Sequence, residues 1–76
     1  MKRTRSSADL IAARELLGWS RATVAVKLQR SGVMVEDAER GRGGEENRAR
    51  LIALYEAAGV EFLPDGQVRI KTDGAR

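Results

Sequence analysis

The sequence predicts a mainly α-helical protein, a compact bundle of four to five helices followed by a C-terminal β-hairpin or strand. Apolar residues recur at spacings of three and four over most of residues 8–58, as they do on the buried face of a helix. After Gly59, apolar residues instead alternate on both sides of a Pro-Asp-Gly turn, which is typical of a hairpin. A chain of 76 residues has room for one domain with one small core.

The first two helices are predicted from their ends and their apolar faces. The first is expected to begin after one of the serines at positions 6–7, which can serve as its N-cap, and to end at Gly18. Its apolar face consists of Leu10, Ala13, Leu16 and Leu17. Trp19 is expected to fill the space between the two helices. Ser20 is the predicted N-cap of the second helix, which runs through Leu28.

The middle of the chain predicts two further helices. Residues 29–32 form the turn into a third helix over residues 33–39. The glycine-rich segment 41–44 is the clearest loop in the sequence. A fourth helix is expected over residues 45–58, because leucine, isoleucine, tyrosine and alanine recur there at helical spacing and Gly59 follows as a terminator.

The C-terminal hairpin is predicted over residues 60–70, with its turn at residues 64–66. A lone two-stranded hairpin is marginal in water, so it is expected to dock on the helices or to pair with another chain. A second copy of the chain is the favoured partner, and the apolar face of the last helix is the other candidate dimer surface. The hairpin residues predicted to form the dimer interface are Val60, Phe62, Val68 and Ile70.

The charge of the chain is concentrated at its start. The net charge is +3, and three basic residues supply all of it: Lys2, Arg3 and Arg5. We therefore expect residues 1–6 to be a flexible basic arm, residues 7–70 to be a single domain and residues 71–76 to be a disordered tail. Such an arm can reach a DNA groove or phosphates if the body behind it also binds nucleic acid.

The composition excludes several classes of protein. There is no cysteine or histidine, and the carboxylates are scattered among arginines, so we expect no catalytic residues, no metal site and no cofactor. No stretch approaches the roughly 18 consecutive apolar residues of a membrane helix. No apolar signal-peptide block follows the N-terminus. The expected protein is soluble, cytoplasmic and not an enzyme.

Three phrases occur in order along the chain: AARELLGWSRATVAVKL, ERG and LIALYEAAGVEF. The stretch from Leu10 to Gly59 that contains them resembles the Cro/XRE type of bacterial and phage helix-turn-helix regulators. In that family, the first phrase ends helix one and opens helix two, the second closes the recognition helix, and the third leads into a C-terminal strand. The resemblance implies that Ala25 lies where the two motif helices cross and that Val35 and Ala38 are buried.

The resemblance also implies a function. The chain would be a sequence-specific transcriptional regulator, most simply a repressor, that binds an inverted repeat of double-stranded DNA as a homodimer. Its recognition helices would enter successive major grooves, about one helical turn apart. The residues implied to contact DNA are Arg21, Ser31, Gly32, Val33, Met34, Glu36, Asp37, Arg40 and Arg42, with Lys2, Arg3 and Arg5 of the arm.

Different roles are expected within this set. Basic side chains would bind phosphate, although Arg40 is equally placed to pair with Glu36 one turn back. Glu36 or Asp37 can accept a hydrogen bond from cytosine, and Val33 or Met34 can contact a thymine methyl group. Specificity would then depend partly on DNA shape.

The chain departs from the family in two ways. The family turn carries glycine and then an apolar residue, where this chain has Gln29 and Arg30. Because Ser-Gly-Val follows at residues 31–33, a longer second helix and a truncated third form an alternative register. The third helix also lacks the Arg, Lys, Asn and Gln that usually read bases. The alternative function is therefore a protein-binding antiactivator or antitoxin-like module that has lost DNA readout.

Overall fold

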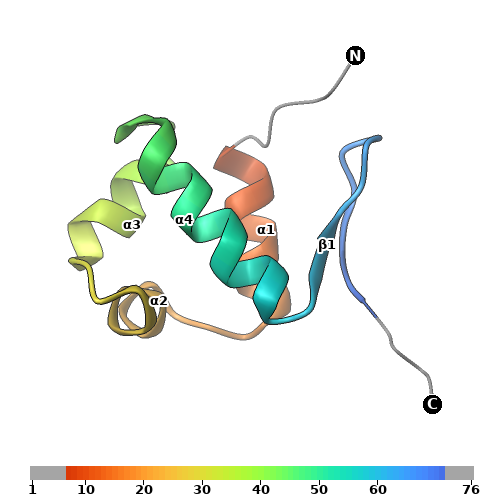
Figure 1. Ribbon diagram of the computed structural model, residues 1–76, viewed down its shortest axis with the longest axis horizontal. Coiled ribbons are helices and arrows are strands. Elements are labelled where there is room, and N and C mark those ends of the chain that lie inside the picture. Colours follow the sequence, from red (N-terminus) through yellow and green to blue (C-terminus); the bar gives the residue numbers. More distant parts are fainter. Residues whose placement is uncertain (1–6, 72–76) are drawn as a thin grey trace.

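The computed structural model describes residues 7–71, over which the chain forms four helices and a two-stranded antiparallel sheet (Figure 1). The predicted fold class is confirmed. The predicted arm, with Lys2, Arg3 and Arg5, and residues 72–76 of the predicted tail lie outside the described residues. The elements are α1 (Ser7–Leu16), α2 (Arg21–Leu28), α3 (Gly32–Glu39), α4 (Gly44–Ala57), β1 (Val60–Phe62) and β2 (Val68–Ile70).

Helix α1 buries all but one of the residues predicted for its apolar face. Leu10 and Ala13 are fully buried, and Leu17 packs against the core. Leu16 is instead 47% exposed, so its assignment to the apolar face is wrong. At about 100° per residue, Leu17 lies about 20° from Leu10 around the helix axis, whereas Leu16 lies about 120° away. Gly18 ends the helix with φ at 71°, as expected.

The turn between α2 and α3 determines the register of the two helices. Ser20 caps α2 by accepting a hydrogen bond from the Thr23 N–H at 3.1 Å. Gln29 ends α2 in the left-handed conformation, with φ at 57°, at a cost of about 1–2 kcal/mol for a residue other than glycine. Ser31 then caps α3 by accepting from the Met34 N–H at 3.2 Å. The alternative register, with a longer second helix, is therefore wrong.

Helices α3 and α4 each begin one residue before their predicted starts. Helix α3 begins at Gly32 because Ser31 serves as its cap, and it ends at Glu39 as expected. Helix α4 begins at Gly44 after Gly43, whose φ is 88°. Its buried side chains are Leu51 and Tyr55, so only part of its apolar pattern faces the core.

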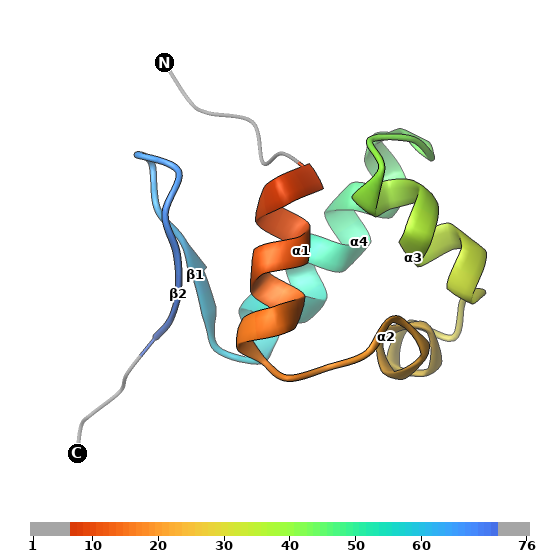
Figure 2. The same cartoon turned by 180° about the vertical axis from the view of Figure 1, so that it is seen from behind.

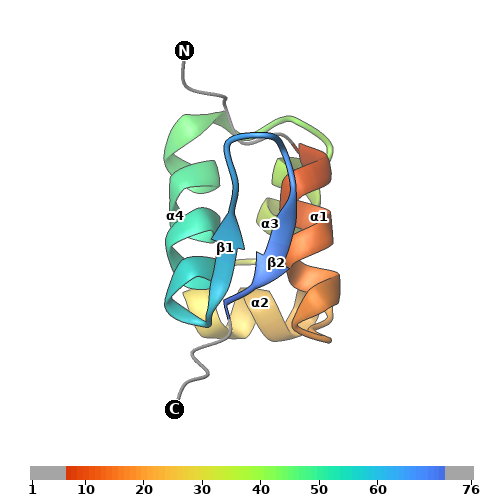
Figure 3. The same ribbon diagram turned by 90° about the vertical axis from the view of Figure 1, so that its right-hand side faces the viewer.

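The hairpin docks on the helices by one face. Its register pairs Val60 with Ile70 and Phe62 with Val68, which places these four side chains on the same face. Strand β1 lies against α4 and β2 lies against α1 (Figure 3). Val60 and Phe62 are buried in the chain's own core, so their assignment to a dimer interface is wrong. Val68 also packs against this core.

The core lies between the helices and the hairpin. Trp19 packs against it, with its ring centroid 6.3 Å from that of Tyr55 on α4. Helices α2 and α3 lie at one end of the molecule and the hairpin lies at the other (Figures 1 and 2). Among the described residues, no helix is long and apolar enough to span a membrane. The buried apolar residues are Leu10, Ala13, Val24, Ala25, Met34, Val35, Ala38, Leu51, Tyr55, Val60 and Phe62.

Candidate nucleic-acid interface

Helices α2 and α3 pack against each other through small and branched side chains. Ala25 on α2 is buried at 7% exposure, as a small residue between packed helices would be. Val35 and Ala38 are fully buried, as expected for the inner side of α3. Met34 is also buried and belongs to the core cluster. Its assignment to DNA is wrong, because a side chain enclosed by the core cannot reach a thymine methyl group.

The first turn of α3 is open to solvent. Ser31, Gly32 and Val33 are all exposed, and the Val33 side chain is 63% exposed. Ser31 already accepts a backbone hydrogen bond as the N-cap, but its hydroxyl hydrogen is free to donate to an acceptor outside the chain. This turn therefore offers one hydroxyl donor, two methyl groups and very little steric bulk.

The second half of α3 is acidic but partly neutralised. The Glu36 carboxylate forms an ion pair with Arg40 at 2.8 Å, and both side chains are partly exposed. Asp37 is half-buried, and its carbonyl accepts the N–H of Arg42 at 2.8 Å. Of the two arginines predicted to contact DNA at the end of α3, Arg40 is thus paired with Glu36, whereas Arg42 is exposed. This pairing leaves Asp37 as the carboxylate of α3 that would repel a phosphate.

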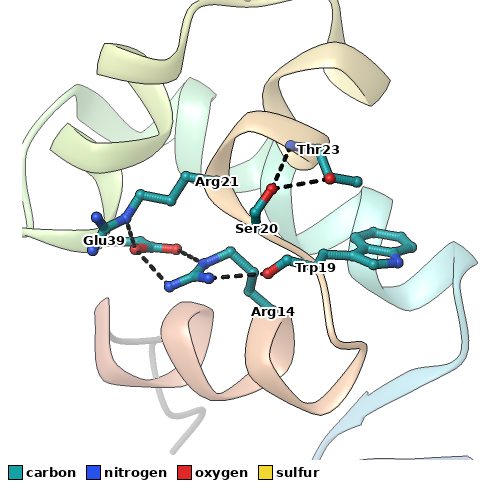
Figure 4. Close-up of polar contacts among 6 residues, drawn as sticks. All are labelled: Arg14, Trp19, Ser20, Arg21, Thr23 and Glu39. Carbon is teal, nitrogen blue, oxygen red and sulfur yellow. Dashed lines mark hydrogen bonds and ion pairs between the residues drawn. The ribbon is translucent and has the colours of Figure 1, made fainter.

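The buried carboxylate of Glu39 links α3 to α1 and α2 (Figure 4). Glu39, the last residue of α3, has a side chain only 1% exposed. Its Oε2 accepts from Arg14 Nε at 2.6 Å, and its Oε1 accepts from Arg21 Nε at 2.8 Å. Arg14 also donates from Nη1 to the Trp19 carbonyl at 3.0 Å. We call Arg14, Arg21 and Glu39 the arginine–glutamate cluster.

The arginine–glutamate cluster contains two positive charges and one negative charge. The Arg14 side chain is only 13% exposed and balances the charge of the buried Glu39 carboxylate. The positive charge of Arg21 is therefore not balanced within the cluster. The Arg21 side chain is 51% exposed. Its Nε binds Glu39, and among residues 7–71 its two Nη groups have no protein partner (Figure 4). The hydrogen bond and the charge of Glu39 also raise the pKa of Arg21 above its ordinary value, so this cation persists at any physiological pH.

The sequence offered a clue to Glu39 that the prediction did not use. Glu39 follows Val35 by four residues and Ala38 by one, so it belongs to the buried side of α3 rather than to the solvent face. Arg14 likewise follows Leu10 by four residues and Ala13 by one. A charged residue at the edge of a buried apolar stripe needs a partner of opposite charge. Only the structure shows that Arg14 and Glu39 are each other's partners.

Positive charge prevails around α2 and the turn. Residues 16–35 contain no aspartate or glutamate, whereas Arg21, Lys27 and Arg30 all lie in this stretch and are exposed. Lys27 places its Nζ 4.7 Å from the centre of the Trp19 ring. The exposed part of the segment from α2 to the first turn of α3 is therefore positively charged as a whole.

Helix α2 also exposes an apolar side chain. Val26 is 75% exposed, and it lines a shallow, open hollow together with Ala22, Thr23 and Lys27. Within residues 7–71, no group of histidine, cysteine, aspartate and glutamate side chains is arranged to hold a metal ion.

No protein-family model, curated protein or solved structure matches this chain.

Proposed function

We propose that the chain is a DNA-binding transcriptional regulator of the helix-turn-helix kind, acting in the cytoplasm as a homodimer on an inverted repeat. The observation that supports this most is the open first turn of α3, which follows an acid-free, basic α2 and a three-residue turn. A short, exposed helix end of this kind fits a major groove. The resemblance to Cro/XRE regulators points the same way.

Phosphate binding would depend first on Arg21. Glu39 holds the Nε edge of its guanidinium at 2.8 Å, which restricts the side chain and leaves the Nη groups free to bind phosphate oxygens. An arginine that is already oriented loses less conformational entropy when it binds. Arg42 and Arg30 are exposed and would add attraction at the end of α3 and at the turn. Arg40 contributes less, because it already pairs with Glu36.

Base reading would depend on the first turn of α3. The methyl groups of Val33 can contact a thymine methyl group, and the Ser31 hydroxyl can donate to a base acceptor. Gly32 is exposed and has no side chain, so it allows a close approach of the backbone to DNA. These contacts are few, so the proposal expects modest base discrimination and a larger share from DNA shape.

The test is a fluorescence anisotropy titration of the purified protein at several salt concentrations. One duplex carries the DNA upstream of the protein's own gene and the other carries the same bases scrambled. The upstream duplex should bind more tightly. Replacing Arg21 with alanine should reduce the salt dependence of log K by about 0.9 for each phosphate that the variant no longer neutralises.

Arg69→Ala is the matched control. Arg69 lies on β2, at the opposite end of the molecule, and pairs with Glu61 at 2.9 Å, so its loss should leave the salt dependence unchanged. Circular dichroism checks that Arg21→Ala is folded, since this variant removes one cation from Glu39. Weak binding that is equal for the two duplexes and insensitive to Arg21→Ala would contradict the proposal.

A protein-binding module is the second candidate, and the 75% exposure of Val26 favours it. A partner with an apolar and acidic surface would fit the hollow beside Lys27. In this case, affinity for the partner would fall less steeply with salt than DNA binding does, because only a few charge pairs are screened and no counterions are released from DNA. A protein retained by the wild type and lost by Val26→Glu, together with no preference between the duplexes, would favour this candidate.

A further inference from the structure

The guanidinium of Arg21 has one edge bound to the protein and one edge open to solvent. Its Nε donates to Glu39 Oε1 at 2.8 Å. Its two Nη groups have no partner within the part of the chain that the structure describes, and the side chain is 51% exposed. The planar guanidinium keeps its donors in a fixed arrangement. The contact at Nε therefore sets the direction of the open edge (Figure 4).

Glu39 is itself held in place by a second arginine. Its side chain is 1% exposed, and its Oε2 accepts from Arg14 Nε at 2.6 Å. Arg14 also donates to the Trp19 carbonyl at 3.0 Å, so its own guanidinium is restricted by the segment before α2. Arg14 thus fixes the carboxylate to which Arg21 binds.

We propose that Glu39 is a positioning residue for DNA binding, which directs the paired Nη groups of Arg21 to the two non-bridging oxygens of one phosphodiester. This inference rests on the proposed function and gives a role in it to a buried side chain that does not touch DNA. When only charge is counted, a carboxylate 2.8 Å from Arg21 weakens the attraction for phosphate. Glu39 instead raises affinity through orientation, because a guanidinium held in its bound geometry loses less conformational entropy and can donate two parallel hydrogen bonds.

Only arginine can make both contacts from separate edges. A lysine ammonium is a compact charge on a flexible stem, so pairing with the buried Glu39 would draw it away from a phosphate. Arg30, another exposed arginine of the acid-free stretch, lacks such an anchor. Among residues 7–71, its side chain makes only a hydrogen bond to the Gln29 carbonyl at 3.4 Å. Arg30 therefore attracts phosphate by charge, whereas Arg21 binds it at a fixed place.

The first test uses substitutions for which charge and orientation predict different results. Dissociation constants for the upstream duplex are measured by fluorescence anisotropy, and circular dichroism checks that each variant is folded. Glu39→Gln removes a negative charge, so charge alone predicts tighter binding. We expect the dissociation constant to rise by about threefold or more, because a neutral amide holds Arg21 less firmly. Arg21→Lys keeps the positive charge and should still raise the dissociation constant by about tenfold.

Arg69→Lys is the matched control for Arg21→Lys. The Nε of Arg69 also pairs with a glutamate, at 2.9 Å, but this pair lies on the hairpin, at the other end of the molecule from α3 (Figure 1). The same substitution there should leave the dissociation constant unchanged.

A second test locates the phosphate and needs no variant of Glu39. Single phosphodiesters of the upstream duplex are replaced, one at a time, by uncharged methylphosphonates. At one linkage in each half-site, the replacement should weaken binding of the wild type by about tenfold. Arg21→Ala should be almost insensitive to replacement at this linkage, because it no longer binds that phosphate. If Glu39→Gln is unfolded, Arg21→Lys and this scan decide the question.

Three results would overturn the positioning role and leave the DNA-binding proposal standing. They are tighter binding by a folded Glu39→Gln, full affinity of Arg21→Lys, and an affinity loss in Arg21→Ala that is coupled to no single linkage. Weak binding of the wild type that is equal for the upstream and scrambled duplexes would overturn both proposals.

Discussion

Replacing Glu39 with glutamine is expected to destabilise the fold more than any other single loss of charge on α3. The Glu39 side chain is 1% exposed and compensates Arg14, which is 13% exposed. Removing one partner of a buried ion pair costs about 3–5 kcal/mol, because the other charge is left in a poorly solvated place. Glutamine keeps one oxygen acceptor, so we expect a cost at the lower end of that range. This is a large part of the few kcal/mol that stabilise a domain of this size.

The assay is urea unfolding followed by circular dichroism at neutral pH. Glu36→Gln is the matched control, because it removes the same charge from the same helix but breaks only a partly exposed pair with Arg40. Such a pair is worth about 0.3–0.5 kcal/mol. The wild type, Glu36→Gln and Glu39→Gln should therefore unfold at decreasing urea concentrations, with a large gap before the last. A Glu39→Gln variant no less stable than Glu36→Gln would refute the reasoning that the arginine–glutamate cluster stabilises the fold.

Three further predictions concern other parts of the fold. Gln29→Gly should stabilise the protein by about 1 kcal/mol in the same assay, because glycine adopts the left-handed conformation of Gln29, with φ at 57°, without a steric cost; a loss of stability would contradict this explanation. Burial, with a smaller contribution from Glu39, raises the pKa of Tyr55 to about 12, from about 10 in an unfolded chain. The folded state thus holds this proton more tightly, and the resulting stability is fully present below about pH 10 and falls by about 2–3 kcal/mol as the pH rises to about 12. Tyr55→Phe should lack this part of the decline in alkaline urea titrations, and an identical pH profile would refute it. Phe62→Ala should cost about 3–5 kcal/mol by thermal or urea unfolding, because Phe62 belongs to the core; loss of the dimer with unchanged stability would instead place it at an interface.

Much of the local structure could be predicted from the sequence, because its causes lie within a few residues. The predicted cap at Ser20 acts on the amide three residues later, and the glycine at position 18 ends the helix just before it. The burial of Val35 and Ala38, in contrast, was expected from the resemblance to a known family. The hairpin followed from alternating apolar residues around a strong turn. These features are determined by backbone geometry and short-range hydrogen bonds.

The candidate site was less predictable, because its contacts join distant parts of the chain. Arg14 and Glu39 are 25 residues apart, and nothing in either neighbourhood says that the two meet, or that Arg21 shares the same carboxylate. The surplus charge at Arg21, a central element of the proposed DNA contact, follows only from that meeting.

Tertiary packing also decided which apolar residues are buried. Met34 and Val33 are adjacent and both apolar, yet Met34 belongs to the core and Val33 faces solvent. Val60, Phe62 and Ile70 share one face of the hairpin, but only the first two are covered when that face meets the helices. The sequence by itself determined the elements, their ends and their periodicity. Only the tertiary structure decided which faces, charges and edges were left for a partner, because burial depends on what each element packs against.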